Sequence, residues 1–368
     1  MIVVAALAFV VWVYLLFGHG RFWQAEPVLP PARPASAPSV AIVVPARDEA
    51  PVIEATLRSL LAQDYPGPFR VILVDDESTD GTGERARALA DSRLTVLAGR
   101  PRPAGWSGKL WAVAQGVEEA GEAALILLTD ADIIHDPRHL SALAARAERY
   151  DLVSEMVELS CVTLAETALV PAFVFFFQLL YPFAWVNDPL RATAAAAGGT
   201  ILVQRRALER IGGIAAVRDA LIDDVALATA VKRGGRIWLG HSALARSIRP
   251  YPRISDIWRM VARTAYVQLR TSKLLLAMCV AAMALTWLVP PLATIAGSGA
   301  ARALGAAAWA GMAWSYLPTL RRFRLSPLWA PFLPLVALFY TAATIGSALN
   351  HHFGRGVVWK SRAYQEAA

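Results

Sequence analysis

Two aspartates one residue apart, Asp130 and Asp132, follow a short apolar run at residues 124–128. In an extended segment, residues i and i+2 point to the same side of the chain, so the two carboxylates face the same space. Hard divalent cations prefer oxygen ligands and often combine one or two carboxylates with the phosphates of a substrate. The spacing therefore predicts a Mg²⁺ or Mn²⁺ ion, held by Asp130 and Asp132, that bridges the protein to a diphosphate.

Acidic residues follow two other apolar runs in a similar way. Residues 47–49 come shortly after the run at 40–44, and residues 75–76 come directly after the run at 71–74. One acidic turn after a strand is usually a solvated helix cap. In a parallel sheet, however, ligands bind beyond the carboxyl ends of the strands, and all such turns then lie on one rim. Three acidic turns on that rim predict a ligand site.

Alternating strands and helices must position these turns. Each apolar run is short and ends in turn residues, which is typical of a strand, whereas apolar residues at helical spacing fill the segments between them. The expected strands are residues 40–44, 71–74, 94–97 and 124–128, and the expected helices are residues 52–63 and 83–90. This alternation predicts an α/β fold with a parallel sheet, and the continuous apolar strands indicate that both of its faces are covered.

The order of these motifs resembles that of family 2 glycosyltransferases. The matching segments are residues 43–49, 74–82, 108–112 (Gly-Lys-Leu-Trp-Ala), 130–132, 212–213 (Gly-Gly) and 222–227 (Ile-Asp-Asp-Val-Ala-Leu). The resemblance covers roughly residues 40–275. It implies a GT-A fold, which is the Rossmann-like fold of nucleotide-diphospho-sugar transferases, and an inverting, metal-dependent glycosyltransferase.

Carried over position by position, the resemblance implies that Pro45, Arg47 and Glu49 line the nucleoside pocket of the donor site. It also implies that Asp76 accepts a hydrogen bond from the base, a role that suits a carboxylate because an ionised carboxylate offers only acceptors. Lys109 is expected near the diphosphate. A solvated lysine at a helix start is the alternative for Lys109.

Asp224 takes the position of the catalytic base, which withdraws a proton from the acceptor hydroxyl. The alternative is a helix cap, since carboxylates favour helix N-termini. Arg263 fits the arginine of the Gln-x-x-Arg-Trp motif of processive family members and would clamp the pyrophosphate, but Met260 and Thr264 replace its partners. The departure favours transfer of a single sugar over polymerisation. A membrane-surface arginine is the alternative for Arg263.

The composition places part of the chain in a membrane. Hydrophobic residues make up 56% of the 368 residues, and four uncharged runs approach or exceed the roughly 20 apolar residues that cross a bilayer. The first run has no preceding basic residue and no evident cleavage site, which favours an anchor over a secretory signal peptide. The expected organisation is an anchor at 1–20, a proline-rich linker at 21–39, a GT-A domain at 40–273, about three transmembrane helices at 274–350 and a basic tail at 351–368.

Basic residues flank the membrane runs, and the positive-inside rule then predicts a cytoplasmic catalytic domain. We therefore expect a multi-pass protein of the bacterial inner membrane. The same rule is violated at residues 351–368, because a fourth span would place this basic tail outside the cytoplasm. Either the last apolar run is therefore re-entrant, or the basic tail tolerates the outer side. The net charge of +7 reflects these flanking residues, which face anionic headgroups, and no nucleic-acid partner is expected. With only Cys161 and Cys279, neither a disulfide framework nor a cysteine metal site is supported.

An uncharged aromatic segment at residues 167–187 interrupts the predicted GT-A domain. It is long enough to span a membrane, but Pro171, Gln178 and Pro182 interrupt it, and aromatic residues favour the membrane interface. We expect this segment to lie in the membrane plane and to bring a lipid acceptor to Asp224. A buried core helix is the alternative.

Within the family, the leading span, the motifs and the trailing spans look most like bacterial hopene-associated glycosyltransferases, relatives of ceramide glucosyltransferase. This resemblance implies a nucleotide-sugar donor, in the simplest case a UDP-sugar, and a lipid acceptor such as a hopanoid. Two other classes stay open. A polyprenyl-phosphate sugar transferase shares the donor motifs but delivers the sugar to a phosphate oxygen, which needs no base. A non-catalytic membrane scaffold would have no need to retain Asp76, the two metal aspartates and Asp224 together.

Overall fold

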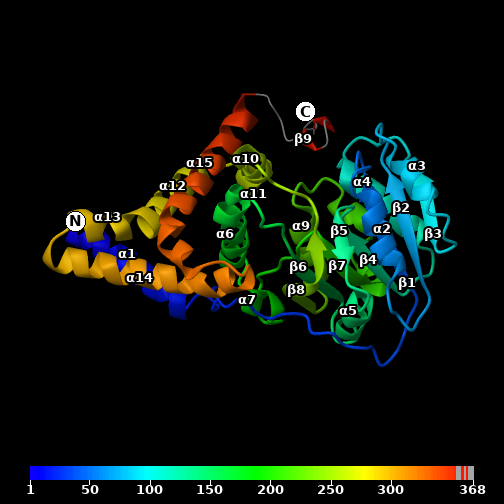
Figure 1. Ribbon diagram of the computed structural model, residues 1–368, viewed down its shortest axis with the longest axis horizontal. Coiled ribbons are helices and arrows are strands. Elements are labelled where there is room, and N and C mark those ends of the chain that lie inside the picture. Colours follow the sequence, from blue (N-terminus) through cyan, green and yellow to red (C-terminus); the bar gives the residue numbers. More distant parts are fainter. Residues whose placement is uncertain (354–357, 360–361, 364–368) are drawn as a thin grey trace. The chain divides into compact units, whose positions relative to one another are not determined.

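The computed structural model describes residues 1–353, 358–359 and 362–363. The chain divides into two compact units (Figure 1). The sheet unit comprises Glu26–Ser160, Trp185–Pro250 and the end of the chain, and the helical unit comprises Met1–Ala25, Cys161–Ala184 and Tyr251–Val358. Most of the basic tail predicted at 351–368 lies outside the described residues, apart from a helix end and the short strands β9 (Val358–Trp359) and β10 (Arg362–Ala363).

Eight strands form the sheet of the sheet unit, in the order β3-β2-β1-β4-β7-β6-β8-β5. Their bounds are β1 Val40–Ala46, β2 Phe69–Asp75, β3 Leu94–Ala98, β4 Leu125–Thr129, β5 Ile133–His135, β6 Leu152–Glu158, β7 Thr200–Gln204 and β8 Ile237–Ser247. The four strands predicted from the sequence are β1 to β4, and they are parallel to one another as expected. The other half of the sheet is mixed, because β7 is antiparallel to β4 and to β6, and β5 is antiparallel to β8.

Helices pack on both faces of this sheet, as the continuous apolar strands predicted. Their bounds are α2 Ile53–Leu61, α3 Thr82–Arg87, α4 Gly108–Glu119, α5 His139–Ala147, α8 Arg205–Arg210 and α9 Asp223–Lys232. Residues of α2 and α5 share one core cluster with Ile42 of β1, and Ala112 of α4 belongs to another cluster with Ala41. α4 lies very close to β1, since a Cβ at Gly116 would lie 2.3 Å from Val43 Cγ1. The close contact fixes the start of α4 relative to the strand ends.

The helical unit is a bundle whose helices approach through small residues. Its main helices are α1 Ile2–Phe17, α6 Leu164–Leu180, α10 Ile254–Ala262, α11 Ala265–Gln268, α12 Lys273–Met283, α13 Val289–Ala296, α14 Gly299–Arg322 and α15 Leu333–His352. Ala5 of α1, Ala293 of α13 and Ala301 of α14 form one buried cluster. A Cβ at Gly305 would lie 2.8 Å from the Cβ of Ala293. Small side chains at such contacts let helix backbones approach closely, as in membrane helix pairs.

One hydrogen bond in this bundle repairs a break in a helix. Pro290 has no N–H, so it cannot donate to the carbonyl of Thr286 four residues earlier. The indole Nε1–H of Trp12, on α1, donates to that carbonyl at 2.8 Å. Apolar surroundings make an unmatched carbonyl costly. The proline pair at 290–291 is therefore tolerated because α1 packs against it.

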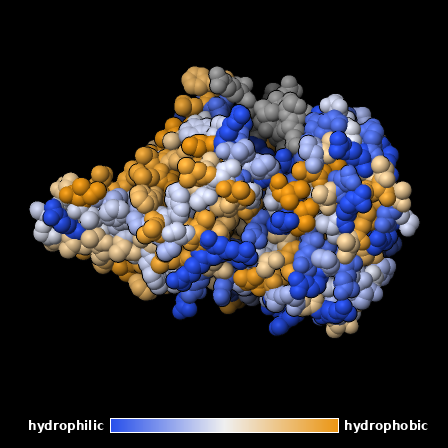
Figure 2. Space-filling view, viewed as in Figure 1, coloured by the Kyte–Doolittle hydropathy of each residue, from blue (hydrophilic) through white to orange (hydrophobic). Residues whose placement is uncertain are grey.

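Two helical stretches among the described residues are long and apolar enough to cross a membrane, Lys273–Ala296 and Pro327–His352. α1 and α6 are apolar but shorter. α14 has 24 residues, but it carries Arg302 within its first turns and does not reach the same apolarity. Figure 2 shows hydrophobic side chains gathered over these helices, and the exposed ones include Leu7, Val10, Leu274, Leu292 and Leu335. The number and orientation of membrane spans stay predictions.

The aromatic segment at 167–187 forms α6 and the short helix α7 (Phe183–Asn187). Pro171 lies inside α6 without ending it. Phe175 is fully buried and makes edge contacts with the rings of Phe22 and Trp287. α6 is thus a packed helix of the helical unit. Its predicted place in the plane of a membrane stays a prediction.

Candidate active site

Hydrogen bonds tie the loop after β1 to the loop after β2. The backbone N–H of Asp48 donates to Ser78 Oγ at 3.0 Å, and the backbone N–H of Thr79 donates to Asp48 Oδ1 at 2.9 Å. The backbone N–H of Glu49 donates to Thr82 Oγ1 at 2.8 Å. Asp48 has a φ of 50°, a left-handed conformation that persists in a non-glycine residue when its surroundings impose it. The two acidic turns predicted from the sequence therefore form one fixed rim.

Arg47 and Asp76 form a buried pair on this rim. Nη1 of Arg47 donates to the carbonyl oxygen of Asp76 at 2.5 Å and lies 3.6 Å from its carboxylate Oδ2. The Asp76 side chain is only 1% exposed, and a buried carboxylate requires a cation or hydrogen bonds to be tolerated. Pro45, at the end of β1, lines the neighbouring pocket. The structure thus brings together the residues that the resemblance assigns to the nucleoside, while their contact with a base stays a prediction.

Arg249, which follows β8, joins the rim to Asp132, the second of the two aspartates predicted to bind a metal. Its Nη2 lies 2.6 Å from Glu49 Oε1, and its Nε lies 2.9 Å from Asp132 Oδ2. The hydroxyl of Ser247 also donates to Asp132 Oδ2, at 3.0 Å. Sequence analysis missed Arg249, because no local motif marks an arginine that lies 117 residues away from its partner Asp132. The only local signal is its position just after a long strand.

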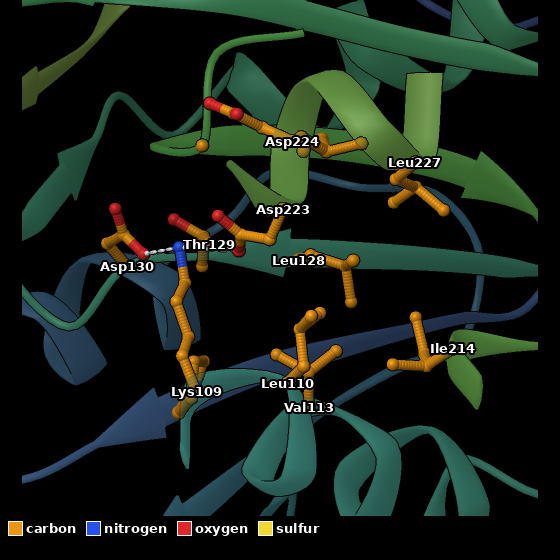
Figure 3. A pocket seen from close by; sticks show the side chains of 13 residues that line it. Lys109, Leu110, Val113, Leu128, Thr129, Asp130, Ile214, Asp223, Asp224 and Leu227 are labelled. Carbon is orange, nitrogen blue, oxygen red and sulfur yellow. Dashed lines mark ion pairs between the residues drawn. The ribbon is translucent and has the colours of Figure 1, made fainter. Parts of the chain in front are cut away.

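Lys109 lies between two carboxylates on one side of a pocket (Figure 3). It sits in the first turn of α4, whose N-cap Ser107 accepts a hydrogen bond from the N–H of Leu110. Its Nζ lies 3.0 Å from Asp130 Oδ1 and 3.2 Å from Asp223 Oδ2. Burial opposes the charge of this ammonium group, but the two carboxylates outweigh it, so the pKa of Lys109 is raised and the group stays protonated. The alternative of a solvated helix-start lysine does not describe this geometry.

Asp224 lies in the first turn of α9, one residue after Asp223. The N-cap position belongs to Ile222, and Asp224 Oδ1 accepts a hydrogen bond from the N–H of the next residue, Val225, at 2.8 Å. Burial, together with the charge of Asp223, raises the pKa of Asp224 to about 7, although Lys109 and backbone hydrogen bonds oppose the shift. A carboxyl group with this pKa can accept and return a proton near neutral pH.

The pocket around Lys109 has a charged side and an aliphatic side. Figure 3 shows Lys109, Asp130, Asp223 and Asp224 on one side. The aliphatic side is lined by Leu110, Val113, Leu128, Ile214 and Leu227. A polar group that reacts on the charged side would therefore have apolar walls beside it.

Gly198, which precedes β7, is a pocket residue that the sequence analysis missed. A Cβ at this position would lie 3.3 Å from Asp224 Oδ2 and 3.4 Å from Lys109 Nζ. These distances are at the tight end of normal contacts, so a side chain would crowd both charged groups. The run of small residues at 194–199 was the available signal, since it allows a backbone to approach a site closely.

Asp130 and Asp132 fit a divalent cation by donor type. Both offer hard carboxylate oxygens, and the Asp130 side chain is partly exposed beside the pocket. Each carboxylate is balanced by a cationic side chain, Lys109 for Asp130 and Arg249 for Asp132. Within the described residues no group of three or more histidine, cysteine or acidic side chains could hold a metal by itself. An ion here would therefore need further oxygen ligands from a substrate or from water, as Mg²⁺ sites commonly do.

A chain of buried polar groups lies behind the β4 strand end. His139 Nε2 contacts Glu155 Oε1, and His139 Nδ1 lies 2.8 Å from His135 Nδ1. His135 Nε2 lies 3.1 Å from the hydroxyl of Thr129, which precedes Asp130. Both nitrogens of each imidazole are thus engaged by protein groups. The two histidines support the strand end and are not arranged as metal ligands.

Arg263, predicted to clamp the pyrophosphate, belongs to the helical unit. It is the C-cap residue of α10, and its backbone N–H donates to the carbonyl of Arg259. Its predicted contact with the donor stays a prediction.

Comparisons with known proteins place the chain in context. The model of glycosyl transferase family 21 matches residues 2–367. Among solved structures, the chain is similar to a mannosyltransferase from Pyrobaculum calidifontis in complex with GDP-Man and Mn²⁺, with 20% sequence identity and a TM-score of 0.53, covering 96% of this chain and 99% of that chain. It is also similar to TarS from S. aureus, with 17% identity and a TM-score of 0.42, covering 62% of this chain and 40% of that chain. No curated protein matches the chain.

The likeness to the Pyrobaculum calidifontis mannosyltransferase extends over nearly the full length of both chains. At 20% identity it shows the fold alone. It confirms the predicted fold class, an α/β GT-A domain combined with apolar helices.

Proposed function

Since this chain belongs to glycosyl transferase family 21, we propose that it transfers one sugar from a nucleotide-diphospho-sugar to a hydroxyl group of a membrane lipid. The observation that carries this proposal is Asp224, a carboxyl group with a pKa near 7 in the same pocket as Lys109 and Asp130. A base, a cation and a metal-type carboxylate are the groups that displacement of a nucleoside diphosphate by a hydroxyl requires.

The donor occupies the rim and the pocket in this proposal. The nucleoside lies against Pro45, Arg47 and Glu49, and Asp76 accepts a hydrogen bond from a uracil imide N–H, so that the donor is a UDP-sugar. The diphosphate lies toward Lys109, whose raised pKa keeps its positive charge available. Asp130 and Asp132 would hold Mg²⁺ or Mn²⁺, which supplies charge neutralisation for the departing nucleoside diphosphate when bound. Neutralised in this way, the diphosphate becomes a better leaving group.

The reaction is a single displacement with inversion at the anomeric carbon. The oxygen of the acceptor hydroxyl forms the new bond to that carbon while the bond to the diphosphate oxygen breaks. Asp224 takes the hydroxyl proton, and its pKa near 7 lets it do so and then release the proton to solvent. Lys109 stabilises the negative charge that moves onto the leaving group.

The acceptor is a lipid because the family resemblance and the apolar helices point to a membrane. Two stretches of the helical unit are long and apolar enough to cross a bilayer, and resemblance to hopene-associated glycosyltransferases favours a hopanoid or another polycyclic lipid. The aliphatic side of the pocket, near Leu227 and Ile214, suits an apolar acceptor whose hydroxyl reaches Asp224.

The first test is donor turnover by purified protein in detergent. We expect metal-dependent consumption of a UDP-sugar, with release of UDP that stops when EDTA removes the cation and resumes when Mn²⁺ is added back. Absence of turnover with every nucleotide sugar and lipid extract offered would contradict the enzyme proposal and favour a scaffold.

Loss of the Asp76 carboxylate should act on donor binding. We expect Asp76→Ala to weaken UDP binding by about ten- to a hundredfold, the equivalent of the ~1.5–3 kcal/mol of a charge-assisted hydrogen bond. Calorimetry with UDP and Mn²⁺ measures this affinity. Glu84→Ala, which removes an exposed carboxylate from α3, is the matched control and should bind UDP like the wild type. An unchanged UDP affinity in folded Asp76→Ala protein would remove Asp76 from the donor site.

A further inference from the structure

We propose that Arg249 is a donor-binding residue that balances the charge of the metal aspartate until a cation arrives and then binds the diphosphate. The proposal rests on the proposed function, since it assumes that Asp132 binds the cation. It adds a residue that lies outside the segments on which the family resemblance rests.

The guanidinium group of Arg249 contacts two carboxylates along one of its edges. Nε and Nη2 form one edge of a guanidinium group, the edge that binds a carboxylate or phosphate in a bidentate manner. Here Nε lies 2.9 Å from Asp132 Oδ2, and Nη2 lies 2.6 Å from Glu49 Oε1. The same edge that could grip one phosphate therefore holds one carboxylate from each side of the site.

The charges of this cluster explain why Arg249 is placed there. The side chains of Asp132 and Glu49 are each about 10% exposed, and two buried carboxylates without a cation would destabilise the fold. Arg249 supplies the compensating charge. A divalent cation bound at Asp132 would supply it in excess and would repel the guanidinium group, so Arg249 must then give up Asp132.

The main chain around Arg249 stays fixed while its side chain is able to move. Ser247 pairs with Ile133 across β8 and β5, and the N–H of Ile248 donates to the carbonyl of Asp132 at 2.9 Å. The Arg249 side chain itself is 34% exposed and sits on a flexible stem. The guanidinium group can therefore move a short distance while the backbone of Arg249 stays beside the cation site. A diphosphate bound to that cation would bring negative charge within its reach.

Lys109 offers a useful contrast. Lys109 also pairs with one of the two proposed metal ligands, Asp130, and it has a second partner, Asp223, in the same pocket. If Asp130 binds a cation instead, Lys109 keeps its ion pair with Asp223. Arg249 instead keeps Glu49, which the resemblance assigns to the nucleoside pocket. Arg249 therefore lies between Glu49, which is proposed to contact the nucleoside, and Asp132, which is proposed to bind the cation. The diphosphate is the part of the donor that lies between the nucleoside and the cation.

The proposal predicts opposite changes in two affinities when Arg249 is replaced. For Arg249→Gln without nucleotide, we expect Mn²⁺ to bind about fivefold more tightly than to the wild type, because the competing ion pair, roughly 1 kcal/mol, is gone. With Mn²⁺ saturating, we expect UDP to bind about tenfold or more weakly, since a charge-assisted contact to phosphate is lost. A purely structural role would weaken both affinities or neither.

Isothermal titration of the purified full chain, first with MnCl₂ and then with UDP, measures both affinities. Arg246→Gln is the matched control, because it makes the same substitution at an exposed arginine near the end of β8, three residues before Arg249, and should leave both affinities unchanged. Arg249→Lys keeps the charge without the fork, so it should restore wild-type Mn²⁺ affinity but only part of the UDP affinity. Thermal unfolding adds a second readout, since Mn²⁺ should stabilise Arg249→Gln more than it stabilises the wild type.

Separate outcomes distinguish the two levels of the proposal. If Asp132→Asn abolishes Mn²⁺ binding but Arg249→Gln binds Mn²⁺ no more tightly than the wild type, the role of Arg249 is overturned and the metal site stands. If Asp132→Asn binds Mn²⁺ as well as the wild type, the metal site of the proposed function is overturned together with the role of Arg249. Tighter Mn²⁺ binding with weaker UDP binding in Arg249→Gln supports the proposal.

Discussion

The Asp224→Asn variant is expected to transfer sugar ~10²–10⁴-fold more slowly than the wild type, the effect typical of losing a general base, while its affinity for the donor changes little. Asparagine keeps the shape of the side chain but cannot take the acceptor proton. The substitution should be mild for the fold, because Asp224 is not the N-cap of α9 and asparagine keeps an oxygen that can accept from the N–H of Val225. What is lost is the attraction to Lys109 and to the helix dipole, the latter worth about 0.3–1 kcal/mol. Single-turnover transfer at saturating donor measures the effect.

The pH dependence of the wild type provides the companion result. Because burial and Asp223 raise the pKa of Asp224 to about 7, its base form is the minority below that pH. The transfer rate should therefore rise about tenfold per pH unit below the pKa and level off above it. Asp224→Asn should lose this rise. A variant rate within a few-fold of the wild type would contradict the base assignment and would favour an acceptor that is already ionised, such as a polyprenyl phosphate.

Asp132→Asn is expected to lower metal-dependent transfer by at least ~10²-fold, the equivalent of about 3 kcal/mol of transition-state stabilisation by the cation. The residual activity should respond weakly to added Mn²⁺. Transfer measured over a Mn²⁺ titration checks both points. Full activity with an unchanged Mn²⁺ dependence would contradict the assignment of Asp132 as a metal ligand.

The surroundings of Asp132 make folding an essential control for this variant. Asp132 is a buried carboxylate that accepts hydrogen bonds from Ser247 and Arg249. Its neutralisation weakens one of the two ion pairs of Arg249, so some loss of thermal stability is expected alongside the loss of activity. Asp136→Asn is the control: Asp136 is a partly exposed aspartate on the same segment that forms an ion pair with Arg138, and its replacement should change neither activity nor Mn²⁺ dependence.

The parts of the site that could be predicted from the sequence are those that depend on residues close together in the chain. β1, β2 and β4 are apolar runs followed directly by acidic turns, and parallel strands place such turns on one edge. Lys109 and Asp224 came from motif resemblance, and the pocket contains both. The mixed half of the sheet was not predicted, because its strands lie between segments that carry no regular alternation.

The residues that were missed depend on tertiary contacts between distant segments. Arg249 contacts Asp132 only because β8 pairs with β5, which brings the two residues together. Gly198 matters only because its backbone meets both Asp224 and Lys109. The buried pair of His139 and Glu155 likewise joins α5 to β6, and no spacing in the sequence indicates that contact.

The measurement that tests the central claim most directly is the chemical stability of the lipid product. Purified wild-type protein would be incubated with a radiolabelled UDP-sugar, Mn²⁺ and a bacterial lipid extract that contains both hydroxyl lipids and polyprenyl phosphates, and the labelled lipid would be treated with mild acid. Transfer to a lipid hydroxyl predicts a glycoside that survives this treatment and that Asp224→Asn does not form. A labelled lipid that releases its sugar in mild acid, formed equally well by Asp224→Asn, would contradict the account.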